Sequence, residues 1–487
     1  MQHYLAFDLG AESGRAMLGT ISANGVAVEE LHRFPNVPVR VFSSLYWDTL
    51  RLWHEIQHAI GVAARERRLA LNGVGIDTWG VDFALLGADG ALVDNPRHYR
   101  DPRTNGMMEK LFEAVPRAGV FAATGVQFMQ LNTLYQIYAM KLAGAPALDA
   151  ARTLLFMPDL FNYWMTGAAR CERTIASTSQ FYDPGSGGWA TGLLDRLGIP
   201  SRILPEIVEP GTLLGPLLGS LWPGPEPAPP VYATACHDTA SAVAAVPAQG
   251  GDWCYISSGT WSLMGAELDR PVINETSLAM NLTNEVGVAG RIRLLKNIAG
   301  LWLVQECRRA WSLEGKTYTY EELARAAATA PPFTAVINPD AFLEPGDLPR
   351  RIAEHCHAHG QRAPETPGEF SRTILESLSL RYRQVLESME ALLGRRFGVI
   401  HIVGGGSRNA VLNQFVADAT GRTVVAGPAE ATAIGNVVVQ AMGSGALAGL
   451  DEARALIRRS FPLETFEPKP EADWESAYAR YRTIVRV

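Results

Sequence analysis

Two short segments of the chain combine glycine, hydroxyl and charged residues in a pattern that could hold a phosphate. Residues 8–15 (DLGAESGR) and 257–262 (SSGTWS) each join two apolar stretches through a tight turn. Such a turn presents backbone N–H groups and hydroxyls to an anion, and glycine lets the chain approach it closely. Because the pattern occurs twice, we expect a duplicated fold whose two domains clamp a polyphosphate.

The first of these turns also carries an acid and a base. Asp8 ends the expected first strand, where its carboxylate could hold Mg²⁺ directly or through water. Arg15 lies just beyond the turn and could donate charge-assisted hydrogen bonds to phosphate oxygens. A strand-capping aspartate and a surface arginine would explain the same residues without any ligand.

A third segment, residues 235–243 (ACHDTASAV), places a polar pair between a strand and an alanine-rich helix. A carboxylate at a helix start is favoured in its ionised form, which is the form that a general base needs near neutral pH. Asp238 is therefore a candidate base, and His237 a candidate hydrogen-bond partner of a substrate. The alternative is that Asp238 is an N-cap, because aspartate is among the best N-cap residues.

Two further motifs resemble nucleotide sites. Residues 310–317 (AWSLEGKT) match a relaxed Walker A pattern, but a helix is expected before the lysine where a P-loop needs a buried strand. The glycines at 404–406 follow a strand and open a helix, as in a dinucleotide-binding turn. Asn409 replaces the third glycine of that fingerprint, and no acidic residue ends the next strand. We expect bare backbone there to pack against a nucleotide or, alternatively, to form a plain βα turn.

The elements that must position these residues alternate between strands and helices, which predicts an α/β fold. The first half has expected strands at 3–9, 15–21, 74–78, 82–86 and 231–234, and helices at 47–69, 128–142 and 157–164. The second half has an expected hairpin at 253–268, strands at 292–295, 399–403 and 423–425, and helices at 371–393 and after residue 409. The proline-rich stretch 216–230 could be an interdomain linker or a surface crossing.

Length and composition limit the class of protein. A chain of 487 residues exceeds the size of one core, so we expect two domains, 1–247 and 248–487. A net charge of −7 argues against a nucleic-acid partner. Neither a signal pattern nor an apolar run long enough to span a membrane is found in the sequence, so a cytoplasmic protein is expected. The five scattered cysteines should be reduced thiols, with Cys236 a small buried residue.

With these residues assembled, the chain resembles the FGGY family of carbohydrate kinases over essentially its whole length. The segments that carry the resemblance are residues 7–15 (FDLGAESGR), 75–83 (GIDTWGVDF), 237–243 (HDTASAV), 257–265 (SSGTWSLMG), 295–302 (LKNIAGLW) and 403–406 (VGGG). The resemblance implies two ribonuclease-H-like domains of the actin and sugar-kinase superfamily, with ATP and sugar meeting in the cleft between them. The first domain would bind the sugar and carry the base, and the second would bind the nucleotide.

The resemblance also implies roles for individual residues, with Mg²⁺ and ATP as cofactors. Nucleotide contacts are expected from Ala11, Glu12, Ser13, Gly14, Arg15, Thr260, Gln305, Gly404 and Gly405, with Asp8 at the metal. Sugar contacts are expected from Gly80, His237, Asp238, Thr239 and Asn297, with Asp238 as the catalytic base. Where similar kinases often have serine, Glu12 places an extra carboxylate near the phosphates.

The resemblance further implies L-rhamnulose as the substrate, phosphorylated on its C1 hydroxyl, with L-fuculose or L-ribulose as alternatives. The expected enzyme is a monomer or homodimer without nucleic-acid or membrane partners. Two other classes stay open at this stage. One is a nucleotide-gated scaffold with an actin-like fold, and the other is an NAD-dependent oxidoreductase built on the glycine turn at 404–406.

Overall fold

The structure is a computed structural model that describes residues 1–469 and 473–485. The described chain divides into two compact units. The first contains residues 1–245, 267–294 and 431–460, and the second contains residues 246–266, 295–430 and 461–487. The expected boundary at 247/248 lies close to the end of the first segment, and two later segments also belong to the first unit.

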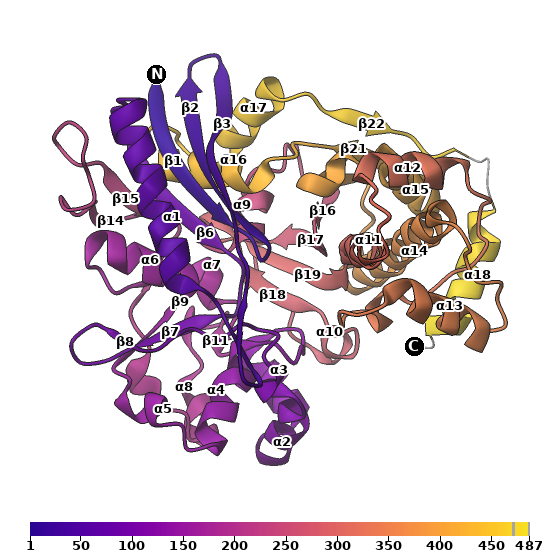
Figure 1. Cartoon of the computed structure of the whole chain (residues 1–487), viewed down its shortest axis with the longest axis horizontal. Coiled ribbons are helices and arrows are strands. Elements are labelled where there is room, and N and C mark those ends of the chain that lie inside the picture. The colour runs from indigo at the N-terminus through magenta and orange to yellow at the C-terminus, as the bar shows by residue number, and fades with distance from the viewer. Residues whose placement is uncertain (470–472, 486–487) are drawn as a thin grey trace. The chain divides into compact units, whose positions relative to one another are not determined.

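The first unit is built on a six-stranded sheet in the order β14-β15-β6-β1-β2-β3, and strands β1, β2 and β3 are the indigo arrows of Figure 1. Its strands are β1 (Gln2–Leu9), β2 (Ser13–Ser22), β3 (Gly25–Pro35), β6 (Gly73–Thr78), β14 (Thr212–Pro216) and β15 (Pro230–Ala233). β1 pairs antiparallel with β2 and parallel with β6, and β15 pairs parallel with β6. The proline-rich stretch joins the antiparallel strands β14 and β15, so it is a surface crossing and not an interdomain linker.

Helices cover this sheet, so its strands are apolar on both faces. Leu5 and Phe7 of β1 share a core with Leu52 and Ile56 of helix α1 (Thr49–Gly61). Helix α16 (Ala431–Gly443) contacts β1 and approaches β2 closely, because a Cβ at Gly19 would lie 2.4 Å from the Val437 side chain. A sheet buried on both faces reads as a continuous apolar run, which is why β1 could be predicted from its sequence.

The rest of the first unit consists of small sheets and short helices. The strands are β4 (Val39–Val41), β5 (Ser44–Tyr46), β7 (Phe83–Leu86), β8 (Leu92–Asp94), β9 (Thr153–Phe156), β10 (Cys171–Glu172), β11 (Tyr182–Asp183), β12 (Gly188–Trp189), β13 (Ile207–Val208) and β18 (Thr283–Val286). The helices are α2 (Met107–Ala114), α3 (Arg117–Thr124), α4 (Thr133–Leu142), α5 (Pro146–Ala150), α6 (Met157–Thr166), α7 (Arg173–Ala176), α8 (Thr191–Leu197), α9 (Asp238–Ala244), α10 (Glu275–Ala279) and α17 (Leu450–Ser460). The expected helix at 128–142 is shorter than predicted, since it begins at Thr133.

The second unit repeats the arrangement of the first. Its sheet has the order β18-β19-β17-β16-β20-β21-β22. The edge strand β18 belongs to the first unit, and β17 and β19 each have residues in both units. The strands are β16 (Trp253–Ser258), β17 (Trp261–Leu268), β19 (Ile292–Ala299), β20 (Val399–Val403), β21 (Thr423–Ala426) and β22 (Glu464–Phe466). β16 pairs antiparallel with β17 and parallel with β20, just as β1 pairs with β2 and β6.

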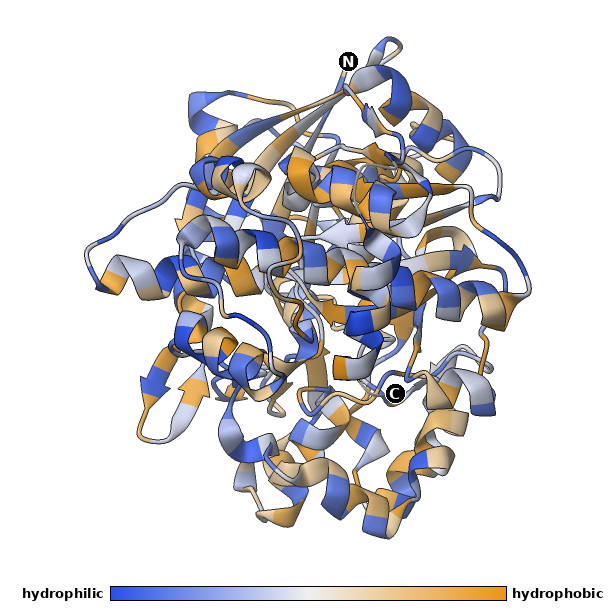
Figure 2. Cartoon of the chain, turned by 90° about the vertical axis from the view of Figure 1, so that its right-hand side faces the viewer, coloured by the Kyte–Doolittle hydropathy of each residue, from blue (hydrophilic) through white to orange (hydrophobic). Residues whose placement is uncertain are grey.

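Helices of the second unit supply most of its core. They are α11 (Trp302–Leu313), α12 (Tyr320–Thr329), α13 (Leu348–Ala358), α14 (Pro367–Leu393), α15 (Ala410–Thr420) and α18 (Trp474–Val485). Orange and blue residues alternate along helices in Figure 2, as expected where one helix face is buried and the other meets water. The longest helix, α14, places Ile374, Leu378 and Leu386 in this core. None of the helices in the described ranges is long and apolar enough to cross a membrane.

Candidate active site

Three aspartates gather where parallel strands of the first unit end. Asp8 on β1 and Asp77 on β6 are direct neighbours in the sheet register, and Asp238 follows the next strand, β15. Asp77 is fully buried, and burial together with the charges of Asp8 and Asp238 raises its pKa well above the ordinary value. Asn436 donates to Asp77 Oδ2 at 2.6 Å, whereas Oδ1 is buried without a hydrogen-bond partner in the described chain. The sheet therefore places three carboxyl groups close together at the ends of these strands.

The turn after β1 is held by backbone hydrogen bonds. Gly10 N donates to Ser13 O at 2.9 Å. Asn36 donates twice to this turn, from its backbone N–H to Glu12 O and from its side-chain amide to Gly10 O. Arg15 forms an ion pair with Asp8, so the expected acid and base meet each other in this structure. Ala11 and Ser13 are partly exposed and Gly14 is buried. The turn is a hydrogen-bonded loop with one positive group at its end.

His237 and Asp238 lie at the junction of β15 and helix α9. His237 occupies the N-cap position without a side-chain capping bond, and Asp238 is the first residue of the helix. The N-cap alternative for Asp238 is therefore wrong. The Asp238 side chain is 30% exposed, and burial raises its pKa despite the lowering effect of His237. A partly exposed carboxylate with a raised pKa is suited to accept a proton.

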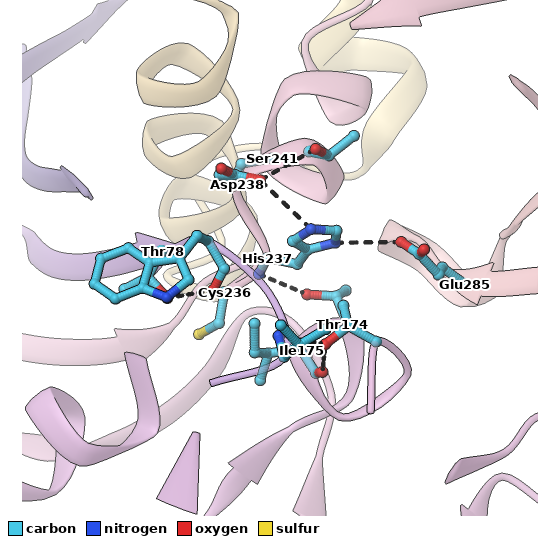
Figure 3. Close-up of polar contacts among 12 residues, drawn as sticks. Thr78, Thr174, Ile175, Cys236, His237, Asp238, Ser241 and Glu285 are labelled. Carbon is cyan, nitrogen blue, oxygen red and sulfur yellow. Dashed lines mark hydrogen bonds and ion pairs between the residues drawn. The ribbon is translucent and has the colours of Figure 1, made fainter. Parts of the chain in front are cut away.

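Two residues that the sequence did not single out fix the backbone of this junction. Glu172 is fully buried, and one of its oxygens accepts from Cys236 N at 3.0 Å. The same carboxylate accepts from Thr174 N and Oγ1, while Thr174 Oγ1 accepts from His237 N at 3.1 Å. Burial raises the pKa of Glu172 to about 7. Figure 3 shows Thr174 beneath the His237 main chain, with Cys236 and Thr78 beside it.

The segment after β6 runs alongside the same junction. Thr78 N donates to Cys236 O at 2.9 Å, and Thr78 and His237 form an isolated parallel bridge. Gly80 follows and is partly exposed. The buried carboxylate of Asp82 fixes this segment, accepting from the indoles of Trp47 and Trp79 at 2.6 and 3.1 Å. Burial raises the pKa of Asp82 to about 6.

In the second unit, the turn between β16 and β17 is tied to the start of α11. Gly259 N donates to Trp261 O at 2.9 Å, and Trp302 N donates to Thr260 O at 3.0 Å. Thr260 is partly exposed. One turn into the helix, the side-chain oxygen of Gln305 is buried and has no hydrogen-bond partner in residues 1–469 and 473–485. Such an oxygen is open to a donor group of a ligand.

The three glycines after β20 differ sharply from one another. Gly404 has φ +84, and a Cβ there would lie 2.9 Å from Ser258 O. A Cβ at Gly406 would lie only 2.0 Å from Ser258 Oγ, so Gly406 is required by packing. At Gly405 a Cβ would meet no atom within 4 Å, and the residue is exposed. Gly405 is therefore the position where bare backbone faces open space.

The expected site residues thus fall into two groups. The first unit contains Asp8, Ala11, Glu12, Ser13, Gly14, Arg15, Gly80, His237, Asp238 and Thr239, and the second contains Thr260, Asn297, Gln305, Gly404 and Gly405. Asn297 is half-buried on β19. The Walker-like residues 310–317 begin in the last turn of α11, and Lys316 pairs with Glu314, which confirms that they form no P-loop. All five cysteines are free and buried, as expected.

The described residues include no cluster of three or more histidine, cysteine or carboxylate side chains that could cage a metal. Mg²⁺ in phosphoryl-transfer sites is commonly held by only one or two carboxylates, with waters and substrate phosphates as the other ligands. The oxygen donors at Asp8 and the unpartnered Asp77 Oδ1 fit that sparse coordination.

Comparison with protein families decides the class of this chain. The model of the N-terminal domain of the FGGY family of carbohydrate kinases matches residues 3–244, and that of the C-terminal domain matches residues 254–444. The chain belongs to the FGGY family of carbohydrate kinases. It is therefore a carbohydrate kinase, and membership implies ATP as the phosphoryl donor. The scaffold and oxidoreductase alternatives are not supported.

Curated relatives and solved structures agree with this assignment. The chain is 46% identical to the rhamnulokinase of Bacteroides thetaiotaomicron, with both chains covered completely. It is 40% identical to the rhamnulokinase of Enterococcus faecalis, over 96% of this chain and 94% of that one. The xylulose kinase of Lactobacillus acidophilus has a similar fold, with a TM-score of 0.81 at 14% identity over 100% of this chain and 97% of that chain. The glycerol kinase of Plasmodium falciparum, solved with ADP, gives 0.79 at 14% identity over 100% and 98%. The predicted two-domain α/β kinase fold is confirmed.

Proposed function

We propose that this FGGY kinase transfers the γ-phosphoryl group of ATP to the C1 hydroxyl of L-rhamnulose, giving ADP and L-rhamnulose 1-phosphate. The observation that carries the proposal is the full-length identity of 46% to a curated rhamnulokinase. The site chemistry is compatible with it, because one unit presents a partly exposed carboxylate at Asp238 and an anion-binding group at Arg15. ATP use favours the cytoplasm as the place of action.

Asp238 is the proposed general base. Its carboxylate orients the sugar hydroxyl and takes the proton as the oxygen forms its bond to the γ-phosphorus and the bond to the ADP oxygen breaks. A positioned base contributes about 10²–10⁴ in rate. The raised pKa of Asp238 makes the carboxylate a better proton acceptor than an ordinary aspartate.

The turn after β1 is the proposed phosphate site of the first unit. Phosphoryl transfer has a loose, anionic transition state, so alignment and charge stabilisation supply most of the catalysis. Backbone N–H groups of residues 11–14 and the guanidinium of Arg15 would face phosphate oxygens, with Arg15 leaving or sharing its ion pair with Asp8. Asp8, with Asp77 beside it, would hold Mg²⁺, which supplies further positive charge when bound.

Thr260, Gln305, Gly404 and Gly405 are the proposed nucleotide contacts of the second unit. Their support is the unpartnered oxygen of Gln305 and the open space at Gly405. Gly80, His237, Thr239 and Asn297 are proposed to line the sugar site. Calorimetry on the Ser13→Ala and Thr260→Ala variants tests the nucleotide part, since each should weaken ATP binding and leave the dissociation constant of the sugar nearly unchanged. Loss of sugar binding alone would contradict it.

The substrate is tested by sugar-dependent ADP release with L-rhamnulose, L-fuculose, L-ribulose and D-xylulose. A pocket that hydrogen-bonds specific hydroxyls leaves its polar groups unpaired when an epimer binds, so kcat/KM should differ by orders of magnitude. L-Rhamnulose should give the highest value. A clear preference for another ketose would overturn the substrate and leave the kinase assignment standing.

A further inference from the structure

A buried ion pair lies directly behind His237. Arg293 on β19 is fully buried, and its Nη2 donates to Glu285 Oε2 on β18 at 3.1 Å. The same Nη2 lies 3.1 Å from His237 Nδ1. Arg293 Nε donates to Val286 O at 3.1 Å, which fixes the plane of the guanidinium. All of these residues belong to the first unit.

The pair faces one edge of the imidazole, and Asp238 faces the other. His237 Nδ1 is 3.4 Å from Glu285 Oε2, and Nε2 is 3.5 Å from Asp238 Oδ1. Figure 3 shows the ring between the two carboxylates. Glu285 is the counter-ion of Arg293, and its pKa lies below the ordinary value although burial acts to raise it.

The contact from Arg293 decides where the neutral imidazole carries its hydrogen. A guanidinium has only donors and stays protonated in proteins, so the ring atom that it contacts must accept. Nδ1 is that atom, and a neutral imidazole with an accepting Nδ1 carries its hydrogen on Nε2. Nε2 is the nitrogen that faces Asp238. The distance from Nε2 to Asp238 Oδ1 is 3.5 Å, which is long for a hydrogen bond. Catalytic hydrogen bonds are often long in structures without substrate and shorten when the substrate binds.

We propose that Arg293, oriented by Glu285, holds His237 as the Nε2–H tautomer and thereby positions the Asp238 carboxylate for proton transfer. This inference rests on the proposed role of Asp238 as the base. Thr239 Oγ1 also donates to Asp238 Oδ1, at 3.1 Å, so two side chains converge on that oxygen. Oδ2 is then the oxygen that receives the sugar proton. In this arrangement His237 acts through Asp238 in addition to lining the proposed sugar site.

The opposite tautomer would work against catalysis. With its hydrogen on Nδ1, the ring would turn the lone pair of Nε2 toward an ionised carboxylate, and the two would repel each other. Asp238 would then rotate away or keep a proton, and either outcome removes the base. Arg293 and Glu285 are thus positioning residues for the reaction.

The tautomer can be read directly from the intact enzyme. Long-range ¹H–¹⁵N spectra of the ¹⁵N-histidine-labelled chain at pH 8 distinguish a bare from a protonated ring nitrogen, and His237→Gln assigns the signal. We expect a bare Nδ1 and a protonated Nε2. A protonated Nδ1, in the other tautomer or in an imidazolium, would overturn the proposal.

Arg293→Met tests the cause of the tautomer. Without the guanidinium, Glu285 is the charged group that faces Nδ1, so Nδ1 should take up a proton, and kcat should fall about tenfold or more with KM for ATP unchanged. A bare Nδ1 in the folded variant would contradict a role for Arg293. Arg293→Lys keeps a donor and should restore part of kcat.

A pair of His237 variants tests the inference even if Arg293 variants do not fold. Glutamine can place an N–H near the position of Nε2, whereas asparagine reaches only to the position of Nδ1. His237→Gln should therefore retain at least about tenfold more kcat than His237→Asn, as a change confined to the catalytic step. Equal kcat values would overturn the inference. If the unaltered chain released no ADP with any ketose, the proposed function would fail while the tautomer result stood.

Discussion

The turn after β1 and the turn after β16 occupy the same place in two sheets of the same topology, yet their chemistry differs. Asp8 pairs with Arg15 across the hairpin and with Asp77 on the parallel neighbour. The equivalent residue of the second sheet is Ser257, which pairs with Leu263 and Val403. Two acids and a base in the first sheet thus correspond to a hydroxyl and two apolar residues in the second.

The same contrast appears at the ends of the next strands. β6 leads into Thr78, Trp79 and Gly80, whereas β20 leads into the bare backbone of Gly404 and Gly405. Two copies of one scaffold therefore carry different chemical groups. In the proposed function, the first unit would supply the charges and the proton acceptor for phosphoryl transfer, and the second an uncharged surface for the sugar and base of the nucleotide.

The strongest test of this division is Asp238→Asn. The amide cannot accept the sugar proton, so kcat should fall by at least about a hundredfold, within the range of about 10²–10⁴ for loss of a positioned base. Steady-state kinetics should show KM for the sugar nearly unchanged, and circular dichroism should show a folded chain. A near-normal kcat would show that Asp238 is not the proton acceptor.

Buried glutamates provide a matched comparison of pH dependence in the two units. Burial raises the pKa of Glu172 to about 7, and that of Glu376 on α14 to about 7 as well. Each keeps a proton in the folded state that the unfolded chain releases above about pH 4.5. The free energy of unfolding should therefore fall as pH rises from about 4.5 to about 7, by up to about 3 kcal/mol for each group.

Urea unfolding of Glu172→Gln and Glu376→Gln across this pH range measures the effect. In each variant, the free energy of unfolding should depend less steeply on pH, because one of the two titrating glutamates is absent. Only Glu172→Gln should also lower kcat, because Glu172 holds Cys236 N at the catalytic junction, whereas Glu376 binds Arg372 and Phe333 N far along the sequence from it. An equal loss of kcat in both variants would contradict the comparison.

Asp8→Asn and Ser257→Ala compare the equivalent positions directly. Loss of the Asp8 charge should lower kcat/KM for ATP about 10- to 100-fold, the equivalent of losing one hydrogen bond to a charged group worth about 1.5–3 kcal/mol. It should also raise the Mg²⁺ concentration needed for half-maximal activity. Ser257→Ala should change kcat/KM less than about threefold. Similar losses in both variants would mean that the two turns share one chemistry.

Gly405→Val and Gly406→Val test whether the nucleotide packs against the uncharged surface of the second unit. At Gly405 the added side chain meets open space in the chain itself, so the fold should persist while KM for ATP rises about tenfold and KM for the sugar stays nearly constant. Gly406→Val should instead lower the melting temperature, because its Cβ would overlap Ser258. Thermal melts and ATP titrations separate the two outcomes. An unchanged KM for ATP in Gly405→Val would contradict the proposal that the nucleotide packs against this surface.

Local patterns were sufficient to predict the strands that carry the site. β1, β20 and the two hairpins are continuous apolar runs bounded by glycine, and such runs are encoded in adjacent residues. The strand-to-helix junction at Asp238 was predicted for the same reason. The N-cap interpretation failed because the register of a helix start depends on a single residue's backbone angles, and His237 took the cap position.

The supporting residues could not be predicted in this way. Glu172 lies 64 residues from the Cys236 amide that it holds, and Arg293 lies 56 residues from His237. A glutamate or an arginine inside an apolar stretch gives no sign of its partner until the strands are assembled. The return of residues 431–460 to the first unit was missed for the same reason, since only the tertiary contacts of α16 reveal it.

Helix α16 belongs to the first unit but lies late in the sequence, which limits the order in which the chain can fold as it is synthesised. Ribosomes release the N-terminus first, and Asn436 follows its partner Asp77 by 359 residues. Until α16 emerges, the sheet of β1 and β6 lacks both the amide that Asp77 needs and the side chain that packs on Gly19. The first unit therefore cannot complete its packing until α16 has been released, and a nascent chain carries an exposed sheet face while residues 295–430 of the second unit are made. Chaperone binding to ribosome-stalled chains should persist up to about residue 460 and then end.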